Sequence, residues 1–307
     1  MPDEACHPSP EPEPYDPERQ DGEPSGYDAG GLVLVSTPIG NLGDMSFRGI
    51  EALRAAELIL CEDTRTTARL LTHYGITTRT APLHEHNEDA ATPRLITRLQ
   101  AGARLALVSD AGTPLVSDPG YRLVRAAIAA GLRVDAVPGA NAATMALVLS
   151  GLPPHPYLFI GFPPPRQAAR RAAFARLRAA ERAGLSATLV FYEAPHRLAQ
   201  TLADMAADFG DRPAAVAREL TKRFEEVRRG GLTALATHYA AEAARGEITV
   251  LVGPAPEEVP AEGDLDSMLQ TLLRTQTVRE AAAFAAQATG LPRKQVYARA
   301  LALRGEA

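Results

Sequence analysis

The segment Val108-Ser-Asp-Ala-Gly-Thr-Pro-Leu-Val-Ser-Asp-Pro-Gly120 decides the fold class of this chain. It follows the apolar run Leu105–Val108, which is typical of a buried parallel strand, and Val35-Ser-Thr-Pro-Ile-Gly-Asn-Leu-Gly-Asp44 follows a similar run, Leu32–Val35. Each Gly/Pro-rich segment is therefore predicted to form a loop at the carboxyl end of a strand, where open α/β sheets bind ligands. One such loop could be an ordinary tight turn, but two together favour a ligand site.

The two loops lack the usual phosphate-binding motifs. Neither G-x-G-x-x-G nor G-x-x-x-x-G-K-[ST] occurs in the chain, so the glycine-rich cradles for a pyrophosphate or triphosphate are missing. Their glycines permit positive φ and let a ligand lie against bare backbone, while Pro38, Pro114 and Pro119 stiffen the loops. The sequence therefore favours a nucleotide-like ligand without phosphates.

Short apolar strands alternate with amphipathic helices from Leu32 to about Ser150, which predicts a parallel α/β unit. Strands are expected at 32–36, 57–61, 79–82, 104–108 and 133–137, and helices at 46–56, 64–74, 88–101, 119–131 and 140–150. After the break Gly151-Leu-Pro-Pro-His-Pro156, a second, mixed series has strands expected at 157–161, 188–192, 214–218, 225–229 and 248–252 and helices at 166–183, 196–208 and 232–244. We therefore predict two α/β domains, at 31–152 and 153–256, and a helical tail at 262–305.

Residues 1–30 have the composition of a disordered tail, with nine acids, one arginine, many prolines and almost no large apolar residue. Without them, the net charge of −5 turns slightly positive, because 31 basic and 28 acidic residues remain. Two cysteines, Cys6 and Cys61, cannot form a disulfide framework, and the chain has no signal-like segment and no apolar run of about 18 residues. We therefore expect a cytoplasmic protein that does not enter a membrane.

The C-terminal segment has the spacing of a helix-turn-helix, given by Ala286, Gly290 and Val296, with Pro292 at the start of the second helix. Basic side chains on that second helix are candidates for contacts with nucleic-acid phosphates. These are Arg293, Lys294, Arg299 and Arg304. The alternative is a plain helical hairpin that packs on the rest of the protein.

An arginine-rich helix is predicted over 166–183. The one acidic residue in this segment is Glu181. Its basic residues are Arg166, Arg170, Arg171, Arg176, Arg178 and Arg182. A solvated basic face explains such a series as well as a track for an RNA backbone does. If it is a track, we expect Arg166, Arg170 and Arg171 to bind RNA.

Polar strings follow several of the predicted strands. Glu62-Asp63-Thr64-Arg65 could place a carboxylate in the ligand site, or Asp63 could simply cap the next helix. The titratable string His84-Glu85-His86-Asn87-Glu88 matches no standard metal-ligand spacing, so no metal is expected; Asn87 could cap a helix, or the string could contact a substrate. Lys222 is one of only two lysines in an arginine-rich chain, which hints that a compact ammonium is needed there.

Eight strings in order resemble the tetrapyrrole methylase superfamily over about residues 31–304. They are T-P-I-G-N-L-G-D at 37–44, C-E-D-T-R at 61–65, L-H-E-H-N-E at 83–88, V-S-D-A-G-T-P-L-V-S-D-P-G-Y at 108–121, V-P-G-A at 137–140, F-Y-E-A-P-H-R-L at 191–198, A-R-E-L-T-K at 217–222 and G-E-I-T-V-L-V at 246–252. The resemblance is closest to the branch that methylates small-subunit ribosomal RNA. It implies a homodimeric α/β methyltransferase that binds S-adenosylmethionine in the cleft between two domains.

The resemblance also implies site residues. Positions that match cofactor contacts, or lie in the same loops, are Pro38, Gly40, Asp110, Gly112, Thr113, Pro114, Asn141, Ala142, Tyr192, Leu220 and Glu247. The implied reaction is methylation of a ribose 2′-hydroxyl on a decoding-region cytidine of 16S rRNA in the small ribosomal subunit. Tetrapyrrole-modifying members usually carry Gly-Asp-Pro where this chain has Gly112-Thr113-Pro114, which argues against a tetrapyrrole acceptor.

A ribose hydroxyl is a poor nucleophile, so a base or a cation near its oxygen should help. We expect Lys222 and Arg197 to stabilise the developing alkoxide or a backbone phosphate, with Glu219 or Asp63 as the base. Two alternatives stay open: methylation of a tetrapyrrole or a protein side chain, and a non-catalytic assembly factor that binds rRNA.

Overall fold

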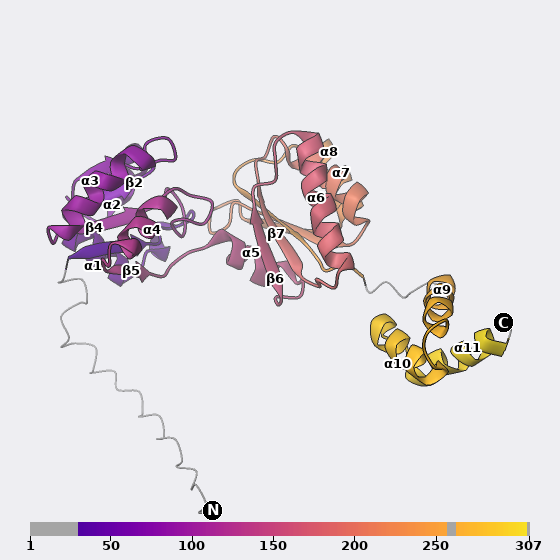
Figure 1. The fold of residues 1–307 in the computed structure, drawn as a ribbon. Helices are drawn as coiled ribbons and strands as arrows, with labels where there is room; N and C mark the ends of the chain where they lie inside the picture. The colour runs from indigo at the N-terminus through magenta and orange to yellow at the C-terminus, as the bar shows by residue number, and fades with distance from the viewer. Residues whose placement is uncertain (1–29, 257–261, 306–307) are drawn as a thin grey trace, which may run out of the picture. The chain divides into compact units, whose positions relative to one another are not determined.

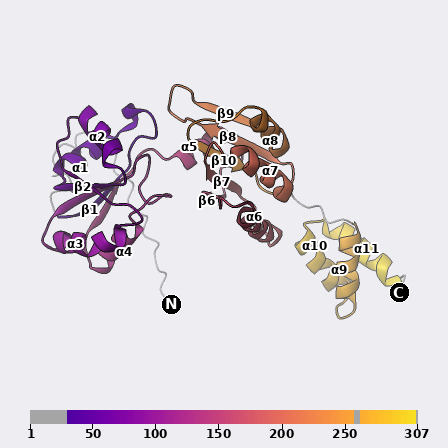
Figure 2. The same cartoon turned by 90° about the horizontal axis from the view of Figure 1, so that it is seen from above.

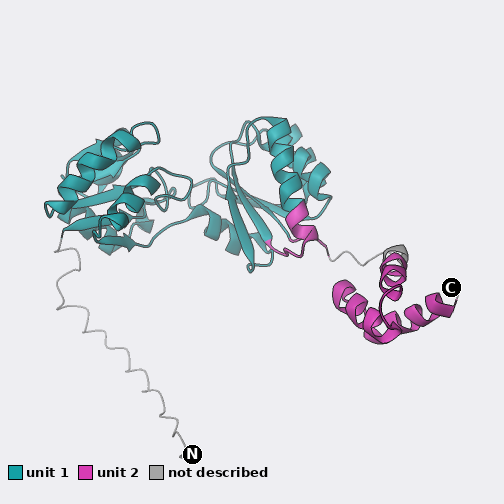
Figure 3. Ribbon diagram, in the orientation of Figure 1, with its two compact units in different colours: residues 1–178, 188–253 teal, residues 179–187, 254–307 magenta. Residues whose placement is uncertain are grey.

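The computed structural model describes residues 30–256 and 262–305, so the predicted tail at 1–30 lies outside the described residues except for Gly30. Contacts divide the chain into two compact units (Figure 3). One contains the described residues up to 178 together with 188–253, and the other contains 179–187 and the described residues from 254 onward.

The first sheet is entirely parallel, with strand order β3-β2-β4-β1-β5. Its strands are β1 (Gly31–Val35), β2 (Leu58–Cys61), β3 (Thr80–Pro82), β4 (Arg104–Val108) and β5 (Val134–Val137). Alternate residues of β1 face opposite sides: Val33 and Val35 belong to one core cluster, while Leu32 belongs to another. Burial on both faces explains why the strands are almost continuously apolar. The four parallel strand pairs confirm the predicted parallel unit.

Helices cover both faces of this sheet (Figure 2). The first face packs α1 (Phe47–Ala55) and α2 (Thr64–His73), and the second packs α3 (Glu88–Gln100) and α4 (Tyr121–Ala129). The predicted helices and strands of this unit lie within two residues of the observed bounds. The carboxyl ends of all five strands therefore face one edge, where the two Gly/Pro-rich loops at 36–44 and 109–120, the signature loops, emerge.

Helix α5 (Ala142–Ser150) packs on the second sheet rather than on the first. Its residues Ala143, Ala146 and Leu147 are buried against Ala215 and Leu251. We predicted a domain division at residues 152 and 153, after this helix; that division remains a proposal. The packing of α5 nevertheless joins the end of the parallel unit to the second sheet.

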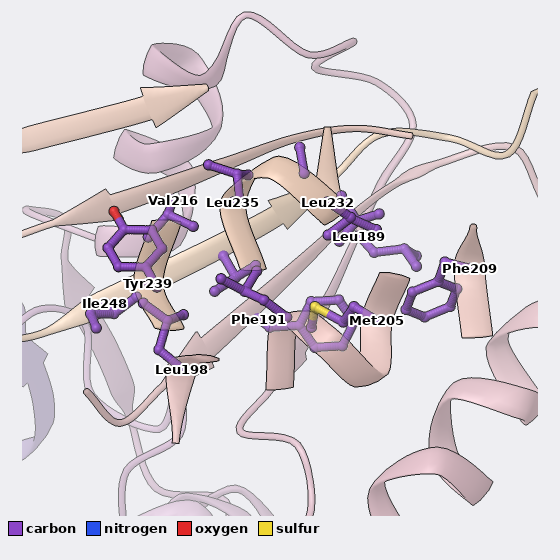
Figure 4. Packing of buried hydrophobic residues seen from close by; sticks show 14 of the residues in the cluster. Leu189, Phe191, Leu198, Met205, Phe209, Val216, Leu232, Leu235, Tyr239 and Ile248 are labelled. Atoms are coloured by element: carbon purple, nitrogen blue, oxygen red, sulfur yellow. The ribbon is translucent and has the colours of Figure 1, made fainter. Parts of the chain in front are cut away.

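The second sheet has the order β6-β7-β10-β8-β9 and is mixed, as predicted: β6 and β7 are parallel and the other neighbours are antiparallel. Its strands are β6 (Tyr157–Gly161), β7 (Thr188–Glu193), β8 (Pro213–Arg218), β9 (Glu226–Gly231) and β10 (Ile248–Val252). The face opposite α5 is covered by α6 (Gln167–Arg182), α7 (Leu198–Phe209) and α8 (Leu232–Ala241) (Figure 1). Phe191, Met205 and Leu235 lie at the centre of this core (Figure 4).

Three helices form the C-terminal unit around their own core: α9 (Glu262–Leu273), α10 (Val278–Thr289) and α11 (Arg293–Gly305). Thr277 and Glu280 form a capping box that starts α10, and Gly290, at φ 69°, ends it in the left-handed region. The two predicted helices and the turn between them are confirmed. In the part of the chain that the structure describes, no helix is both long and apolar enough to cross a membrane.

Candidate functional site

The two signature loops lie side by side because β1 and β4 are neighbours in the sheet. The Thr37 amide donates to the Gly112 carbonyl at 2.9 Å, and the Gly112 amide donates back to the Thr37 carbonyl at 3.1 Å. The Thr37 hydroxyl also donates to the Ser109 carbonyl at 3.1 Å. Gly112 has φ 86°, and an added Cβ would lie 3.2 Å from the Ile39 side chain, so glycine is required where the loops meet.

A third loop, after β5, joins this pair. The Thr113 hydroxyl donates to the Ala140 carbonyl at 3.1 Å. The side-chain oxygen of Asn141 accepts from the amides of Ala143 at 3.0 Å and Thr144 at 3.2 Å, and so caps the start of α5. We call the loops after β1, β4 and β5 the loop wall.

A cavity of about 410 Å³ lies between the loop wall and the strand ends of the second sheet, which we call the sheet wall. This volume falls within the usual range of about 300–1,000 Å³ for small-molecule sites. The predicted cofactor residues that line it are Asp110, Gly112, Thr113, Asn141, Ala142, Tyr192, Leu220 and Glu247. Three others do not: Pro38 and Pro114 stand beside lining residues in the chain, and Gly40 packs against the Lys222 side chain.

Aromatic rings form one side of the cavity. Tyr192, at the end of β7, packs edge-on against Phe159 with ring centroids 5.0 Å apart and lies 5.6 Å from the Phe162 ring. Burial raises the pKa of the Tyr192 hydroxyl. Phe162 lines the cavity although 54% of it is exposed, and sequence reasoning missed it. The feature of the sequence that could have identified Phe162 is its position directly after Gly161, at the carboxyl end of a strand.

The carboxylates of the loop wall have no cationic partner. Asp110 and Asp118 both line the cavity, and within the described ranges no arginine, lysine or histidine forms a salt bridge with either. Burial, and then the charges of Glu62 and Asp110, raise the pKa of Asp118 to about 6. Burial likewise raises the pKa values of Asp110 and Glu62. Sequence reasoning did not single out Asp118.

The charges of the sheet wall are paired. Lys222 Nζ lies 2.9 Å from Glu219 Oε1 and 3.1 Å from Glu247 Oε2, and the Glu247 amide donates to Glu219 Oε1 at 3.1 Å. The hydrogen bond from Lys222 lowers the pKa of Glu219. Burial opposes the charge on Lys222, but the hydrogen bonds to both glutamates outweigh it and raise the lysine's pKa. Glu219 and Thr221 have φ values of 51° and 66°, so this turn is strained.

Arg197 and Asp63 are also held by partners, and neither lines the cavity. Arg197 Nη2 lies 2.5 Å from Glu193 Oε1, and the opposite Glu193 oxygen accepts from the Thr201 hydroxyl at 2.5 Å. Asp63 caps α2 by accepting from the Arg65 amide at 2.8 Å, as the alternative interpretation of its motif predicted. Hydrogen bonds from the side chain and then the amide of Arg65 lower the pKa of Asp63 to about 2. A carboxyl with that pKa is a weak base.

The arginine-rich helix does not present all its cations to solvent. Arg170 is fully buried, with Nη2 2.6 Å from Asp204 Oδ2 on α7, so the prediction that Arg170 binds RNA is wrong. It lies one helical turn from Phe174, on the face of α6 that packs on the sheet. Arg171 is exposed but pairs with Asp208 at 2.7 Å, and Arg166 is exposed.

In the C-terminal unit, Arg293 and Lys294 are exposed in the first turn of α11. Cations at a helix N-terminus oppose the helix dipole, so these two residues are unfavourable for the helix alone. Arg299 is held by Asp266, with Nη2 2.5 Å from Oδ2. Arg293 and Lys294 are therefore accessible to an anionic partner.

The titratable string after β3 has a structural role. Glu88 is buried, and its Oε1 accepts from the amides of Arg122 at 2.8 Å and Leu123 at 3.1 Å, which caps α4. Asn87 accepts from the His84 amide at 2.9 Å and makes no side-chain cap of α3. Among the described residues, no group of three or more His, Cys, Asp or Glu side chains is placed to hold a metal ion.

Comparison with known families matches residues 31–236 to the Tetrapyrrole (Corrin/Porphyrin) Methylases. Residues 259–304 match a family described as the RsmI C-terminal HTH domain. The first match covers both sheets, apart from β10, and the second covers the three C-terminal helices.

The chain is also similar to curated proteins named "Ribosomal RNA small subunit methyltransferase I". It is 48% identical to the one from Mesorhizobium japonicum, over 89% of this chain and 92% of the relative. It is 48% identical to the one from Xylella fastidiosa (strain Temecula1), over 87% of this chain and 98% of the relative. Among solved structures, a diphthine synthase shares the fold with a TM-score of 0.57 and 17% identity, over 72% of this chain and 89% of that one.

Proposed function

Because the chain belongs to the tetrapyrrole (corrin/porphyrin) methylase family, we propose that it transfers the methyl group of S-adenosylmethionine to ribosomal RNA of the small subunit. The finer proposal is that the acceptor is the ribose 2′-hydroxyl of a cytidine in the decoding region of 16S rRNA. The observation that carries the proposal is the cavity between the loop wall and the sheet wall. Eight of the residues expected to contact the cofactor line this cavity. The names of the relatives support ribosomal RNA as the acceptor.

The residues of the cavity fit this methyl donor. Phe162, Tyr192 and Leu220 offer apolar and aromatic surface for an adenosine group. Asp110, which has no cationic partner in the described ranges, complements a ligand that carries an ammonium and a sulfonium. The lack of a glycine-rich phosphate cradle agrees with a nucleoside that carries no phosphate.

When bound, S-adenosylmethionine supplies an electrophilic methyl group on sulfur. The protein's task is then to hold the ribose oxygen in line with that carbon and to exclude water, because orientation alone can save about 7–11 kcal/mol. The hydrogen bonds between Thr37 and Gly112 fix the loop wall, and Asn141 ties the third loop to α5. Lys222, in the turn after β8, packs against Gly40 in the loop after β1, and we propose that it stabilises negative charge on the acceptor.

Exposed cations support an RNA acceptor over a small tetrapyrrole. Arg166 just before α6, Arg171 on α6, and Arg293 and Lys294 on α11 are accessible to phosphates. Phosphate contacts dominate the affinity of proteins for nucleic acids. We further propose that the protein is a cytoplasmic homodimer that acts within the small subunit.

The test is incorporation of labelled methyl groups from S-adenosylmethionine into purified small subunits that lack the modification, followed by nuclease mapping. Label on a ribose 2′-oxygen of a single 16S cytidine is the expected result. Donor binding without label on RNA would indicate another acceptor, such as a tetrapyrrole or a protein side chain. No donor binding would indicate the rival function, an rRNA-binding assembly factor without turnover.

A further inference from the structure

We propose that Asp118 is the general base that removes the proton from the ribose hydroxyl. This inference rests on the proposed function and adds a catalytic residue that sequence reasoning did not identify. It is carried by the position of Asp118 in the cavity, by the geometry of its loop, and by the partners that occupy the other carboxylates.

The loop that carries Asp118 is held in an unusual conformation. Leu115 and Ser117 both have positive φ, at 70° and 67°, although neither is glycine. Such conformations cost about 1–3 kcal/mol each and persist at functional sites when the surroundings enforce them. The fold thus maintains a strained backbone on both sides of Val116, immediately before a carboxylate that lines the cavity.

The loop also reaches the sheet wall. An added Cβ on Gly161 would lie 3.2 Å from the Ser117 hydroxyl, so the loop closely approaches the end of β6. The next residue, Phe162, lines the same cavity. The Asp118 charge is close enough to contribute to the raised pKa of the Tyr192 hydroxyl. Asp118 therefore faces the space in which donor and acceptor would meet.

The groups around Asp118 favour a proton acceptor. Against the rise caused by burial, the Ser109 side chain, whose hydroxyl donates to the Gly112 carbonyl at 3.0 Å, lowers the pKa of Asp118. Glu62, Asp110 and Tyr192 are the titratable groups that interact with Asp118 electrostatically. None of these is a cation. With a pKa of about 6, Asp118 is a stronger base than an ordinary carboxylate and is still mostly ionised at pH 7.

The other carboxylates near the cavity are occupied. Glu193 is bound by Arg197, Thr201 and the Ala194 amide, and Glu219 and Glu247 share Lys222. Asp110 accepts from the Asp63 amide at 3.1 Å. Hydrogen bonds to a carboxylate stabilise its charged form and weaken it as a base. Among the described acidic residues that line the cavity, Asp118 is the one that combines a raised pKa of about 6 with no ion pair.

The proposed step balances as a single displacement. The ribose 2′-oxygen forms a bond to the methyl carbon as the carbon–sulfur bond breaks, and the electron pair of that bond stays on sulfur. The hydroxyl proton passes to a carboxylate oxygen of Asp118. The charges balance, because the sulfonium becomes a neutral thioether and the carboxylate becomes a neutral acid, which later releases its proton to solvent.

The test is Asp118→Asn, which keeps the shape of the side chain and removes its basicity. We expect kcat to fall by about 10²–10⁴-fold, as for loss of a general base, while the Kd for S-adenosylmethionine stays within about threefold. The rise in wild-type activity with pH near 6 should disappear in the variant. Asp118→Ala should regain activity with added formate, which a purely structural role would not allow. Asp89→Asn, an exposed partner of Arg122 on α3, is the matched control.

Several outcomes would overturn the inference. If Asp118→Asn keeps the wild-type kcat and pH profile, another group or solvent takes the proton. If the Kd for the donor weakens in parallel with kcat, Asp118 binds the donor instead. Both results leave the proposed function standing. If wild-type enzyme places no label on ribose, the proposed function itself fails.

Discussion

The two walls of the cavity hold their charges in opposite ways. On the sheet wall, Lys222 bridges two glutamates, and Arg197 neutralises a glutamate that is only 2% exposed. On the loop wall, Asp110 and Asp118 are partly buried and have no cationic partner in the described ranges. A buried ion pair holds its neighbours in place, whereas an unpaired carboxylate costs stability and keeps its reactivity. We propose from this contrast that the proton is taken up on the loop wall, while the ion pairs of the sheet wall hold side chains such as Lys222 in place.

The largest effect on stability should come from Arg197→Ala. It leaves Glu193 buried without its cation, which typically costs about 3–5 kcal/mol. A thermal melt should show Tm lower by roughly 6–20 °C, while activity per folded molecule stays close to wild type. Arg171→Ala, which breaks an exposed pair with Asp208, is the control and should change Tm by no more than about 2–4 °C.

An Arg197→Ala variant with unchanged Tm would contradict the positioning role of the sheet wall. A large loss of activity at unchanged Tm would instead support the role expected from the sequence, stabilisation of the acceptor alkoxide.

Lys222→Ala should reduce kcat/KM by about 10²-fold, the usual scale for removing one charge-stabilising donor. It also leaves Glu219 and Glu247 facing each other at a strained turn, so Tm should fall as well. Steady-state kinetics and a melt of the same sample separate the two effects. Glu219→Gln keeps the lysine and should retain most activity. Full activity in both variants would remove Lys222 and Glu219 from the mechanism.

The fold was predictable because strand periodicity and loop chemistry are local signals. The runs Leu32–Val35 and Leu105–Val108 are strands, and Gly290 ends a helix as expected. The packing of α5 on the second sheet was not predictable, because a helix that is apolar on most sides does not reveal which sheet it covers.

The sequence predicted the residues that line the cavity because they belong to a recognisable loop. It did not predict roles that depend on which charged side chain lies nearby in the folded protein. Gly112 and Asn141 line the cavity because their loops do. Arg170 looked like its neighbour Arg171 in the sequence, but only Arg170 faces Asp204 in the core. Asp63 has its partner Arg65 two residues away in the sequence, whereas the absence of a cation around Asp118 in the described ranges depends on residues distant in the chain.

Asp118→Asn should stabilise the protein without ligand at high pH. In the folded chain the Asp118 pKa is about 6, against an ordinary value of 3.8. The folded state therefore binds more protons between these pH values, and the free energy of unfolding falls as pH rises through this window. Above pH 7 the variant should gain about 1–2 kcal/mol, reduced from the full pKa difference because part of the carboxyl reaches solvent.

Denaturant melts at pH 8 and pH 3.5 check this gain, which should be present at pH 8 and absent at pH 3.5. Asp89→Asn, at an exposed ion pair on α3, should show no such difference. Equal stability of wild type and Asp118→Asn at pH 8 would mean that another group neutralises the Asp118 charge. The loop wall would then not differ from the sheet wall in holding an unpaired carboxylate.

The smallest expected effect concerns a paired and an unpaired arginine at the start of α6. Arg166 is exposed and has no salt bridge among the described residues, whereas Arg171 is already neutralised by Asp208. If paired charges only hold structure, Arg166→Ala should weaken binding to small subunits a few-fold and lower the slope of log affinity against log salt by about 0.7–0.9. The double variant Arg171→Ala/Asp208→Ala removes a neutral pair and should change neither quantity. Filter binding across a salt series measures both quantities. Equal losses of affinity in the two variants would show that Arg171 leaves Asp208 to bind phosphate. Ion pairing in the free protein would then not predict which cations contact RNA.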